Sequence, residues 1–335
     1  MIVLSGDIGG TNTRLQLSRF DEHASNSKVI FTKKYKGVDY ESLADILTLF
    51  ITDSKIDKDD IASACIAVAG PVIKGEVELT NLPWFVTEAE MRAVLQTEHV
   101  KLINDFESIG YGIETLESSD IHTLQKGKYK EEAPVAIIGA GTGIGVGIIL
   151  YHKGDTIVCP TEGGHVDFAP VGDDQTGLLQ FLRKRLRRIS VERVCCGTGM
   201  VNIYKYVIND PHAIHKESPE MHLAMYKSKD KAATISEFAF KYEDPLALRV
   251  IDIFIKVYGS SAGNLALTTL PKRGLFILGG IAPQMLKQMT DGRFMELFLD
   301  KGRMSEILLD IPVHICLNTD VGLQGAERYA SKMLS

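Results

Sequence analysis

The sequence predicts an α/β protein of two lobes, and three observations support this fold class. Its 335 residues exceed the size at which one hydrophobic core keeps growing. Short apolar runs alternate with segments of helical period over the first third of the chain, which is typical of α/β proteins. A plan of apolar strand, Gly/Thr turn and apolar strand occurs twice, at residues 2–17 and 135–150, which indicates a duplicated fold.

Composition points to a globular protein that acts on small molecules. Hydrophobic residues make up 45% of the chain, and the formal net charge of −6 gives no general attraction for nucleic acids or anionic membranes. The five cysteines form no Cys-x-x-Cys pair, so we expect reduced thiols in a cytosolic protein, and the first residues lack the basic region of a signal peptide. The uncharged stretch 133–151 has glycine at alternate positions, which favours a buried hairpin over a membrane helix.

The first glycine-rich turn, after the apolar run at residues 2–4, has the composition of a phosphate-binding loop. Gly9 and Gly10 leave main-chain N–H groups unobstructed, while Thr11 and Asn12 add short polar donors. Asp7 would repel a phosphate, so we expect it to hold metal-bound water. The alternative is an ordinary glycine-rich turn with Asp7 as its cap.

The next segments are interpreted as scaffold. Apolar positions over residues 43–51 predict a helix, and residues 64–69 and 76–80 predict strands. Thr87 and Glu90 form a capping-box pattern that opens a further helix. This helix leads to the strand on which the predicted site depends.

That strand, at residues 100–103, runs into Asn104 and Asp105, after which apolar residues recur at helical spacing. Ligands of open α/β sheets bind at the carboxyl ends of strands, where a carboxylate can act as general base toward a substrate hydroxyl. The alternative is that Asn104 or Asp105 only caps the following helix. The two glycine-rich hairpins favour the first interpretation.

The second hairpin carries Gly139, Gly141, Thr142 and Gly143 at its turn. Neither hairpin has the spacing of a P-loop or of a Rossmann dinucleotide fingerprint. If a pseudo-two-fold axis relates the two hairpins, they would hold a polyphosphate from both sides.

Glu162 and His165 follow, separated by two glycines that disfavour a helix. An acid and an imidazole beside flexible backbone can hydrogen-bond adjacent hydroxyls of a polyol. The alternative is a surface turn with a solvated glutamate and a packed histidine. No cysteine cluster follows His165, which disfavours a zinc site.

The remaining chain predicts more α/β structure. The basic run at 183–188 is interpreted as a solvated helix face, and residues 209–234 as an excursion or a mobile connection. Asp244 and Pro245 predict the start of a long helix. The apolar run 274–278 predicts a buried strand that ends at Gly279 and Gly280, where bare backbone would admit a flat ring such as adenine or simply permit a tight turn. A strand at 311–317 and a helix at 320–333 complete the chain.

Taken together in chain order, these motifs resemble the bacterial glucokinase family. This family belongs to the superfamily of sugar kinases, heat-shock proteins and actin. A sister group of repressors and kinases carries a cysteine-rich zinc motif after the histidine, which this chain lacks. The resemblance covers essentially the whole chain. It implies a two-lobed, actin-like fold with duplicated mixed sheets of the ribonuclease H-like type and a central cleft. The smaller lobe would comprise residues 1–110 and 318–335, and the larger lobe residues 111–317.

The resemblance also implies an activity: phosphorylation of glucose at its 6-hydroxyl, with ATP and Mg²⁺, by a cytoplasmic homodimer that binds neither nucleic acid nor membranes. Asp105 would be the catalytic base. The residues that carry over as sugar contacts are Asn104, Asp105, Glu162, His165 and Glu192. Those that carry over as nucleotide contacts are Gly9, Gly10, Thr11, Asn12, Gly141, Thr142, Gly279 and Gly280, with Asp7 near the metal.

Three alternatives stay open at this point. A regulatory protein of the same fold would bind sugar without producing ADP. An actin-like or chaperone-like ATPase would hydrolyse nucleotide without sugar, and it would leave Glu162, His165 and Glu192 unexplained. A kinase of another hexose would share every motif named above.

Overall fold

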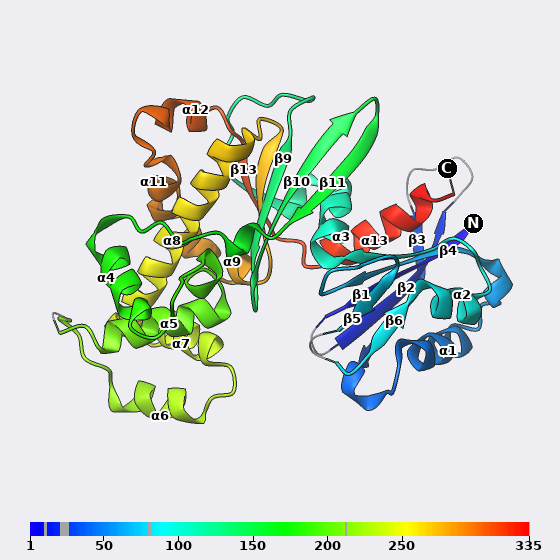
Figure 1. Cartoon of the computed structure of the whole chain (residues 1–335), viewed down its shortest axis with the longest axis horizontal. Coiled ribbons are helices and arrows are strands. Elements are labelled where there is room, and N and C mark those ends of the chain that lie inside the picture. The colour runs from blue at the N-terminus through cyan, green and yellow to red at the C-terminus, as the bar shows by residue number, and fades with distance from the viewer. Residues whose placement is uncertain (10–11, 21–26, 80–81, 212, 335) are drawn as a thin grey trace. The chain divides into compact units, whose positions relative to one another are not determined.

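The computed structural model describes the chain except residues 10–11, 21–26, 80–81, 212 and 335. The chain forms two compact units (Figure 1). The first unit contains Met1–Asp120, Val158–Pro160 and Asn318–Ser335, and the second contains Ile121–Ile157 and Thr161–Leu317. The first boundary therefore falls at residue 120, whereas the resemblance places it at residue 110.

The first unit is built on a mixed five-stranded sheet of order β3-β2-β1-β4-β7. Strands β1 and β2 are antiparallel, and β4 and β7 run parallel to β1. The strands of this unit are β1 (Ile2–Ile8), β2 (Asn12–Phe20), β3 (Ser27–Lys36), β4 (Ile61–Val68) and β7 (Val100–Asn104), with a separate pair β5 (Glu76–Glu78) and β6 (Phe85–Thr87).

Helices cover both faces of this sheet, as Figure 1 shows. Alternate residues of the strands point to opposite faces: Leu4 and Ile66 join the core under α1, whereas Val3, Cys65 and Ala67 join the core under α13. The helices are α1 (Leu43–Ser54) and α2 (Glu88–Leu95) on one face, and α3 (Asp105–Gly112) and α13 (Val321–Lys332) on the other.

The second unit is built on a six-stranded sheet of order β11-β10-β9-β12-β13-β8. Strands β9, β12 and β13 are parallel, and β10 and β8 pair antiparallel with their neighbours. The strands of this sheet are β8 (Ile121–Gln125), β9 (Val135–Ala140), β10 (Ile144–His152), β11 (Asp155–Thr161), β12 (Gly274–Leu278) and β13 (Val313–Cys316); within β11, Val158–Pro160 are counted with the first unit.

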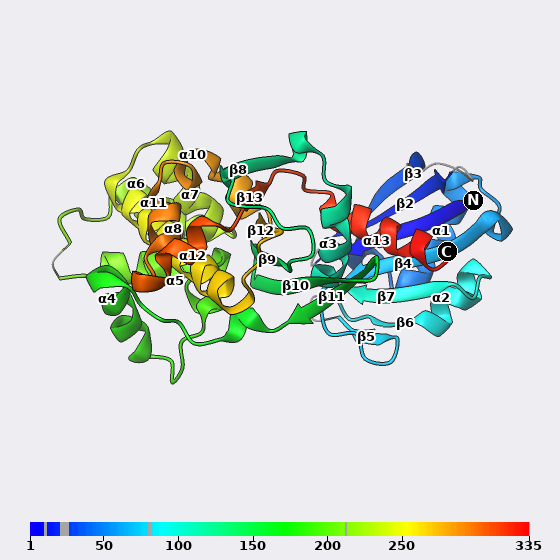
Figure 2. The ribbon, with the colours of Figure 1, turned by 90° about the horizontal axis from the view of Figure 1, so that it is seen from above.

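The long helix α8 (Pro245–Thr269) packs with this sheet in one large core and is seen from above in Figure 2. Its start confirms the prediction at Asp244, whose side chain accepts hydrogen bonds from the N–H groups of Leu246 and Ala247. The other helices are α4 (Gly172–Arg183), α5 (Gly197–Ile208), α6 (Pro219–Lys227), α7 (Lys231–Lys241), α9 (Ile281–Gln284), α10 (Leu286–Met289), α11 (Arg293–Leu299) and α12 (Ser305–Leu309).

The segment 209–234 is more ordered than a mobile connection. Helix α6 lies within it, begins with the Ser218 hydroxyl accepting from the Met221 N–H, and buries Met221 and Met225. The expectation of a mobile connection is therefore wrong for this part, because two methionines spaced one helical turn apart provide an apolar stripe.

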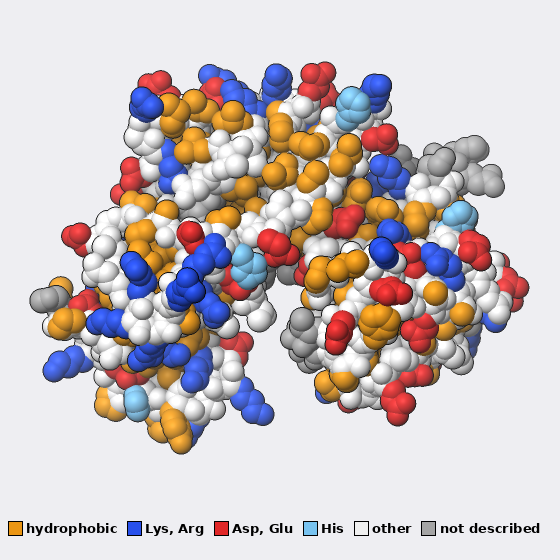
Figure 3. All heavy atoms as spheres, in the orientation of Figure 1, with side chains coloured by type: hydrophobic (Ala, Val, Ile, Leu, Met, Phe, Trp, Pro, Cys, Tyr) orange, Lys and Arg blue, Asp and Glu red, His pale blue; other side chains and the backbone are white. Residues whose placement is uncertain are grey.

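The basic run is exposed, as expected, but the expectation of a helix face is wrong, because α4 ends at Arg183 and residues 184–188 follow it outside any helix. Arg183, Lys184, Arg185, Arg187 and Arg188 are all exposed. Figure 3 shows basic side chains gathered over the α4 to α7 part of the second unit, whereas acidic and basic side chains are interspersed over the first. No helix in the described part of the chain is long and apolar enough to cross a membrane.

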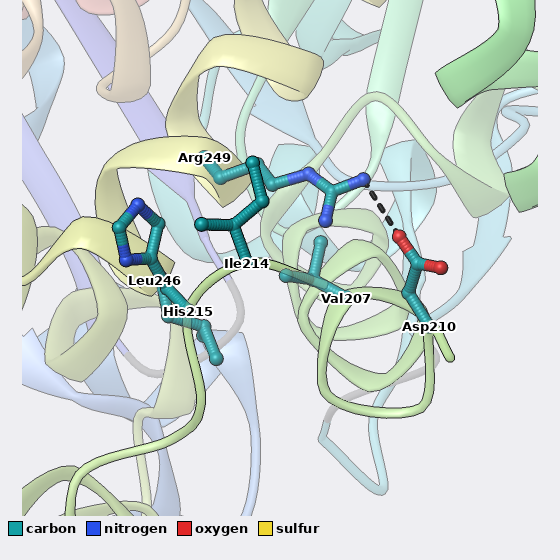
Figure 4. Close-up of a pocket in the computed structure, with 6 residues that line it drawn as sticks. All are labelled: Val207, Asp210, Ile214, His215, Leu246 and Arg249. Carbon is teal, nitrogen blue, oxygen red and sulfur yellow. Dashed lines mark hydrogen bonds and ion pairs between the residues drawn. The ribbon is translucent and has the colours of Figure 1, made fainter. Parts of the chain in front are cut away.

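A charged cluster connects three segments of the second unit beside a pocket of about 300 Å³. Figure 4 shows the residues that line this pocket and the bond between Arg249 and Asp210. The Arg249 guanidinium on α8 donates to Asp174 of α4 at 2.7 Å and to Asp210, which follows α5, at 2.8 Å. The pocket is lined by Val207, Asp210, Ile214, His215, Leu246 and Arg249, and contains none of the predicted site residues.

We expect Arg249→Met to lower the free energy of unfolding by about 1–3 kcal/mol, because the two partly buried carboxylates lose the guanidinium that compensates them. The melting temperature should fall by roughly 3–10 °C in a thermal scan. Lys241→Met is the matched control, since Lys241 pairs with Glu237 on an exposed surface and its loss should shift the melting temperature little. Equal shifts in the two variants would show that the Arg249 cluster contributes no more than a surface pair.

Candidate active site

The first hairpin places Asp7 near the end of β1, directly opposite Arg14 of β2. Burial raises the pKa of the Asp7 carboxyl, the positive charge of Arg14 lowers it, and the charge of Asp320 raises it. Arg14 is itself held by Asp320, whose Oδ1 accepts from both terminal guanidinium nitrogens at 2.8 and 2.6 Å. Asp7 thus lies beside the ion pair of Arg14 and Asp320 in the first unit.

The turn of this hairpin is closed by the Gly9 N–H, which donates to the Asn12 carbonyl at 2.9 Å. A Cβ added at Gly9 would meet only the Asn12 carbonyl oxygen, at an ordinary 3.6 Å. The local geometry therefore does not require glycine at position 9, which leaves close approach of a ligand as a reason for it. The predicted contacts Gly10 and Thr11 lie outside the described residues.

Asn104 and Asp105 have different structural roles at the junction of β7 and α3. Asn104 is the N-cap: its side-chain oxygen accepts from the N–H groups of Phe106 and Glu107, and its amide nitrogen donates to the Gly70 carbonyl. Asn104 therefore does cap α3, while its contact with the sugar stays a prediction. Asp105 is the first residue of the helix, and its Oδ1 shares the Phe106 N–H at 2.9 Å.

The electrostatic surroundings of Asp105 suit a base. Burial raises the pKa of its carboxyl, the hydrogen bond from Phe106 lowers it, and the charge of Asp7 raises it. A carboxylate with a raised pKa binds a proton more readily than an exposed aspartate does. Two partly buried carboxylates that repel each other also form a set of oxygen ligands to which a hard cation such as Mg²⁺ is attracted.

Three of the predicted sugar contacts lie together in the second unit. His165 Nε2 is 3.8 Å from Glu162 Oε2, and His165 Nδ1 is 4.0 Å from Glu192 Oε1. The Glu162 and His165 side chains are 84% and 56% exposed, so they remain accessible to a ligand, whereas Glu192 is 31% exposed. Two carboxylates around an imidazole supply the acceptors and donors that sugar hydroxyls need.

The backbone around His165 is held by the segment that leads to Glu192. Asp167 forms a β-bridge with Ser190, and the Arg188 guanidinium donates to the His165 carbonyl at 2.8 Å and to Asp167 Oδ1 at 2.5 Å. These bonds connect the His165 loop to residues about twenty positions later in the chain. They explain why His165 and Glu192 lie close together.

The second hairpin turns through Gly141 and Thr142. The Gly141 N–H donates to the Gly143 carbonyl, and the Gly141 carbonyl accepts from the N–H of Gly197 at the start of α5, both at 2.8 Å. Thr142 is exposed, and a Cβ added at Gly141 would have no atom within 4 Å. The turn therefore leaves room for a ligand.

Glycine is required at Gly279. Its φ of +84° favours glycine, and a Cβ there would lie 2.4 Å from the Ala140 carbonyl oxygen. A Cβ at Gly280 would have no atom within 4 Å. The two glycines predicted for the adenosine site thus differ: glycine at 279 permits the close approach of Ala140 on the neighbouring strand β9, and position 280 faces open space.

The buried hydroxyl of Tyr258 organises the ends of these strands. It accepts from the Ala140 N–H at 3.1 Å and lies 3.3 and 3.5 Å from the carbonyl oxygens of Ile138 and Leu278. Burial raises the pKa of Tyr258 far above its usual range, so it remains a neutral hydroxyl. It connects α8 to both glycine-bearing strand ends.

The structure thus gathers Asp7, Asn104 and Asp105 in the first unit and Glu162, His165 and Glu192 in the second. Arg14, Arg188 and Tyr258 are residues of the site that were not predicted from the sequence. Arg14 could have been found from the hairpin register, which places it opposite Asp7. Arg188 and Tyr258 carry no local signal, because their partners lie at least twenty residues away in the chain.

Two mixed α/β sheets, each with a glycine-rich hairpin on antiparallel neighbouring strands, together with an acid at a strand end, define a protein of the sugar kinase class. The family model described as Glucokinase matches residues 4–333, so the chain belongs to the glucokinase family. This family membership makes the chain a hexose kinase, a transferase.

Known relatives agree along the whole chain. The chain is 40% identical to a glucokinase of Nostoc punctiforme over 99% of both chains, and 33% identical to one of Shigella dysenteriae over 99% of this chain and 97% of that one. Among solved structures, a glucokinase from an Antarctic psychrotroph aligns with a TM-score of 0.85 at 31% identity, over 99% of both chains.

Proposed function

We propose that the chain transfers the γ-phosphoryl group of ATP to the 6-hydroxyl of D-glucose, forming glucose 6-phosphate and ADP. The observation that carries this proposal is Asp105. Asp105 follows the end of β7, and the pKa of its carboxyl is raised by burial. The neighbouring Asn104 caps α3, because its side-chain oxygen accepts hydrogen bonds from the N–H groups of Phe106 and Glu107. Membership of the glucokinase family supports the choice of glucose among the hexoses.

The proposed roles follow from the chemistry of each side chain. Asp105 accepts the proton of the sugar hydroxyl as the bond from its oxygen to phosphorus forms. Glu162, His165 and Glu192 hydrogen-bond the other hydroxyls and orient the sugar. Asn104 adds its amide to the sugar contacts as well as capping α3.

We propose that backbone N–H groups and the hydroxyls of short side chains bind the nucleotide. Gly9, Gly10, Thr11 and Asn12 of the first hairpin and Gly141 and Thr142 of the second contact the phosphates, and Gly279 and Gly280 border the adenosine. In the described part of the chain, no three His, Cys, Asp or Glu residues are grouped as a metal site. Asp7 would hold Mg²⁺ that arrives with ATP through a bound water, and the ion would neutralise phosphate charge.

The test is a coupled assay of ADP release across a panel of hexoses with a control that lacks sugar. We expect release that depends on glucose. Release without sugar would favour an ATPase, and glucose binding without release would favour a regulatory protein. Faster ADP release with another hexose would identify that hexose as the preferred substrate in place of glucose.

A prediction for the nucleotide site concerns Thr142→Val, which keeps the shape of the side chain but removes its donor. We expect the KM for ATP to rise about 3- to 30-fold with little change in the KM for glucose, because a hydrogen bond to a charged phosphate is lost. Thr268→Val is the matched control, since Thr268 is exposed on α8 and its hydroxyl donates to the Asn264 carbonyl of the same helix. Unchanged binding of a non-hydrolysable ATP analogue to the Thr142 variant would exclude this contact.

We also propose a cytoplasmic homodimer. All five cysteines are free thiols, which supports a reducing compartment. The dimer rests on the resemblance to the family, and sedimentation of the purified chain tests it.

A further inference from the structure

Gly143, at the end of the second hairpin turn, lies against the carboxylate of Glu192. A Cβ added at Gly143 would stand 2.7 Å from Glu192 Oε2 and 3.7 Å from its Cδ. The φ angle of Gly143 is not among the positive values of the chain. The missing side chain therefore provides space, and does not serve an unusual backbone conformation.

The same carboxylate is held from two further directions. Glu192 Oε2 accepts from the N–H of Ile144, the residue after Gly143, at 3.4 Å. Glu192 Oε1 is 4.0 Å from His165 Nδ1. One oxygen thus contacts the glycine-rich hairpin, and the other faces the imidazole.

We propose that Gly143 is a positioning residue for the sugar, because it leaves the space in which the Glu192 carboxylate lies against the hairpin with its other oxygen toward His165. This inference rests on the proposed function, since it takes Glu192 as a sugar contact. One glycine-rich turn would then take part in both sites: Gly141 and Thr142 contact the nucleotide phosphates, and Gly143 positions Glu192 for the sugar.

The physical argument predicts a selective effect of a methyl group at this position. The atom that the methyl group would meet is the end of a flexible side chain, so Glu192 rotates away while the backbone stays in place. The carboxylate then leaves the Ile144 N–H and its place beside His165. At Gly141, two residues earlier, a methyl group would meet no protein atom and would instead occupy the space proposed for the phosphates.

The first experiment compares three Gly→Ala variants for the KM of glucose, the KM of ATP and the melting temperature. Gly143→Ala should raise the KM of glucose roughly 5- to 50-fold, change the KM of ATP less than about 3-fold and leave the melting temperature nearly unchanged. Gly141→Ala should show the opposite split. Gly322→Ala is the control in helix α13, where a Cβ meets only Ile109 Cγ1 at an ordinary 3.5 Å, and both KM values should stay as in the parent.

The second experiment is a double-mutant cycle with Glu192→Gln, read by direct calorimetric titration with glucose. If Gly143 acts through Glu192, adding Gly143→Ala to Glu192→Gln should weaken glucose binding much less than it does in the parent. An unchanged glucose affinity of Gly143→Ala, or additive effects in the cycle, would overturn the inference. A parent chain that binds glucose without releasing ADP would instead refute the proposed function, while the titrations would still decide the role of Gly143.

Discussion

Asp105→Asn is expected to lower kcat by at least about 10²-fold while glucose binding stays within several-fold of the parent. The proton of a sugar hydroxyl must leave as the bond to phosphorus forms, and a positioned carboxylate contributes about 10²- to 10⁴-fold to such a step. Asparagine has nearly the same size and can still hydrogen-bond the hydroxyl, but it cannot accept the proton. Loss of kcat with retained binding marks an interaction made in the transition state.

The control for this variant separates chemistry from folding. Asp60→Asn makes the same acid-to-amide change at an exposed position of the first unit and should leave kcat unchanged. Asparagine is also a good helix N-terminal residue, so a purely structural Asp105 would give a folded and active variant. Near-normal turnover of Asp105→Asn, with a melting temperature equal to that of the parent, would remove Asp105 from the mechanism.

His165→Ala is expected to raise the KM for glucose roughly 5- to 150-fold, because a sugar hydroxyl left unpaired in the site costs about 1–3 kcal/mol. The KM for ATP should remain close to that of the parent. Steady-state kinetics with each substrate varied in turn measures both values.

His152→Ala is the matched control, because His152 is an exposed histidine at the end of β10 and has no predicted role. It should leave both KM values unchanged. If His165→Ala raised the KM for ATP and not that for glucose, the assignment of His165 to the sugar would be wrong.

The elements of the site that local sequence could predict are those whose geometry depends on neighbours in the chain. The antiparallel strands β9 and β10 flank the predicted second glycine-rich turn, and α8 begins at the predicted Asp244 and Pro245. Asn104, at the end of β7, caps α3, which a polar residue between a strand and a helical pattern predicts. In each case, residues a few positions apart determine the structure.

The parts that could not be predicted depend on partners far away in the sequence. Strand β3 (Ser27–Lys36) is an edge strand rich in exposed polar residues, so its composition does not resemble a buried strand. The contact between Gly143 and Glu192, and the bond from Arg188 to the His165 carbonyl, form only when distant segments fold together. A single sequence carries no signal for such pairs.

The position of α13 in the first unit has a consequence for the synthesis of the chain. This helix comes long after β1 and β4 in the chain, yet its Ala326 and Ala330 pack on Val3, Cys65 and Ala67 of those strands. A ribosome releases residues in order, so one face of the β1 sheet emerges long before the helix that covers it. The second unit, whose last residue is Leu317, is complete first. The apolar face of β1 and β4 therefore stays uncovered during synthesis until α13 has been made, which exposes it to aggregation on the nascent chain.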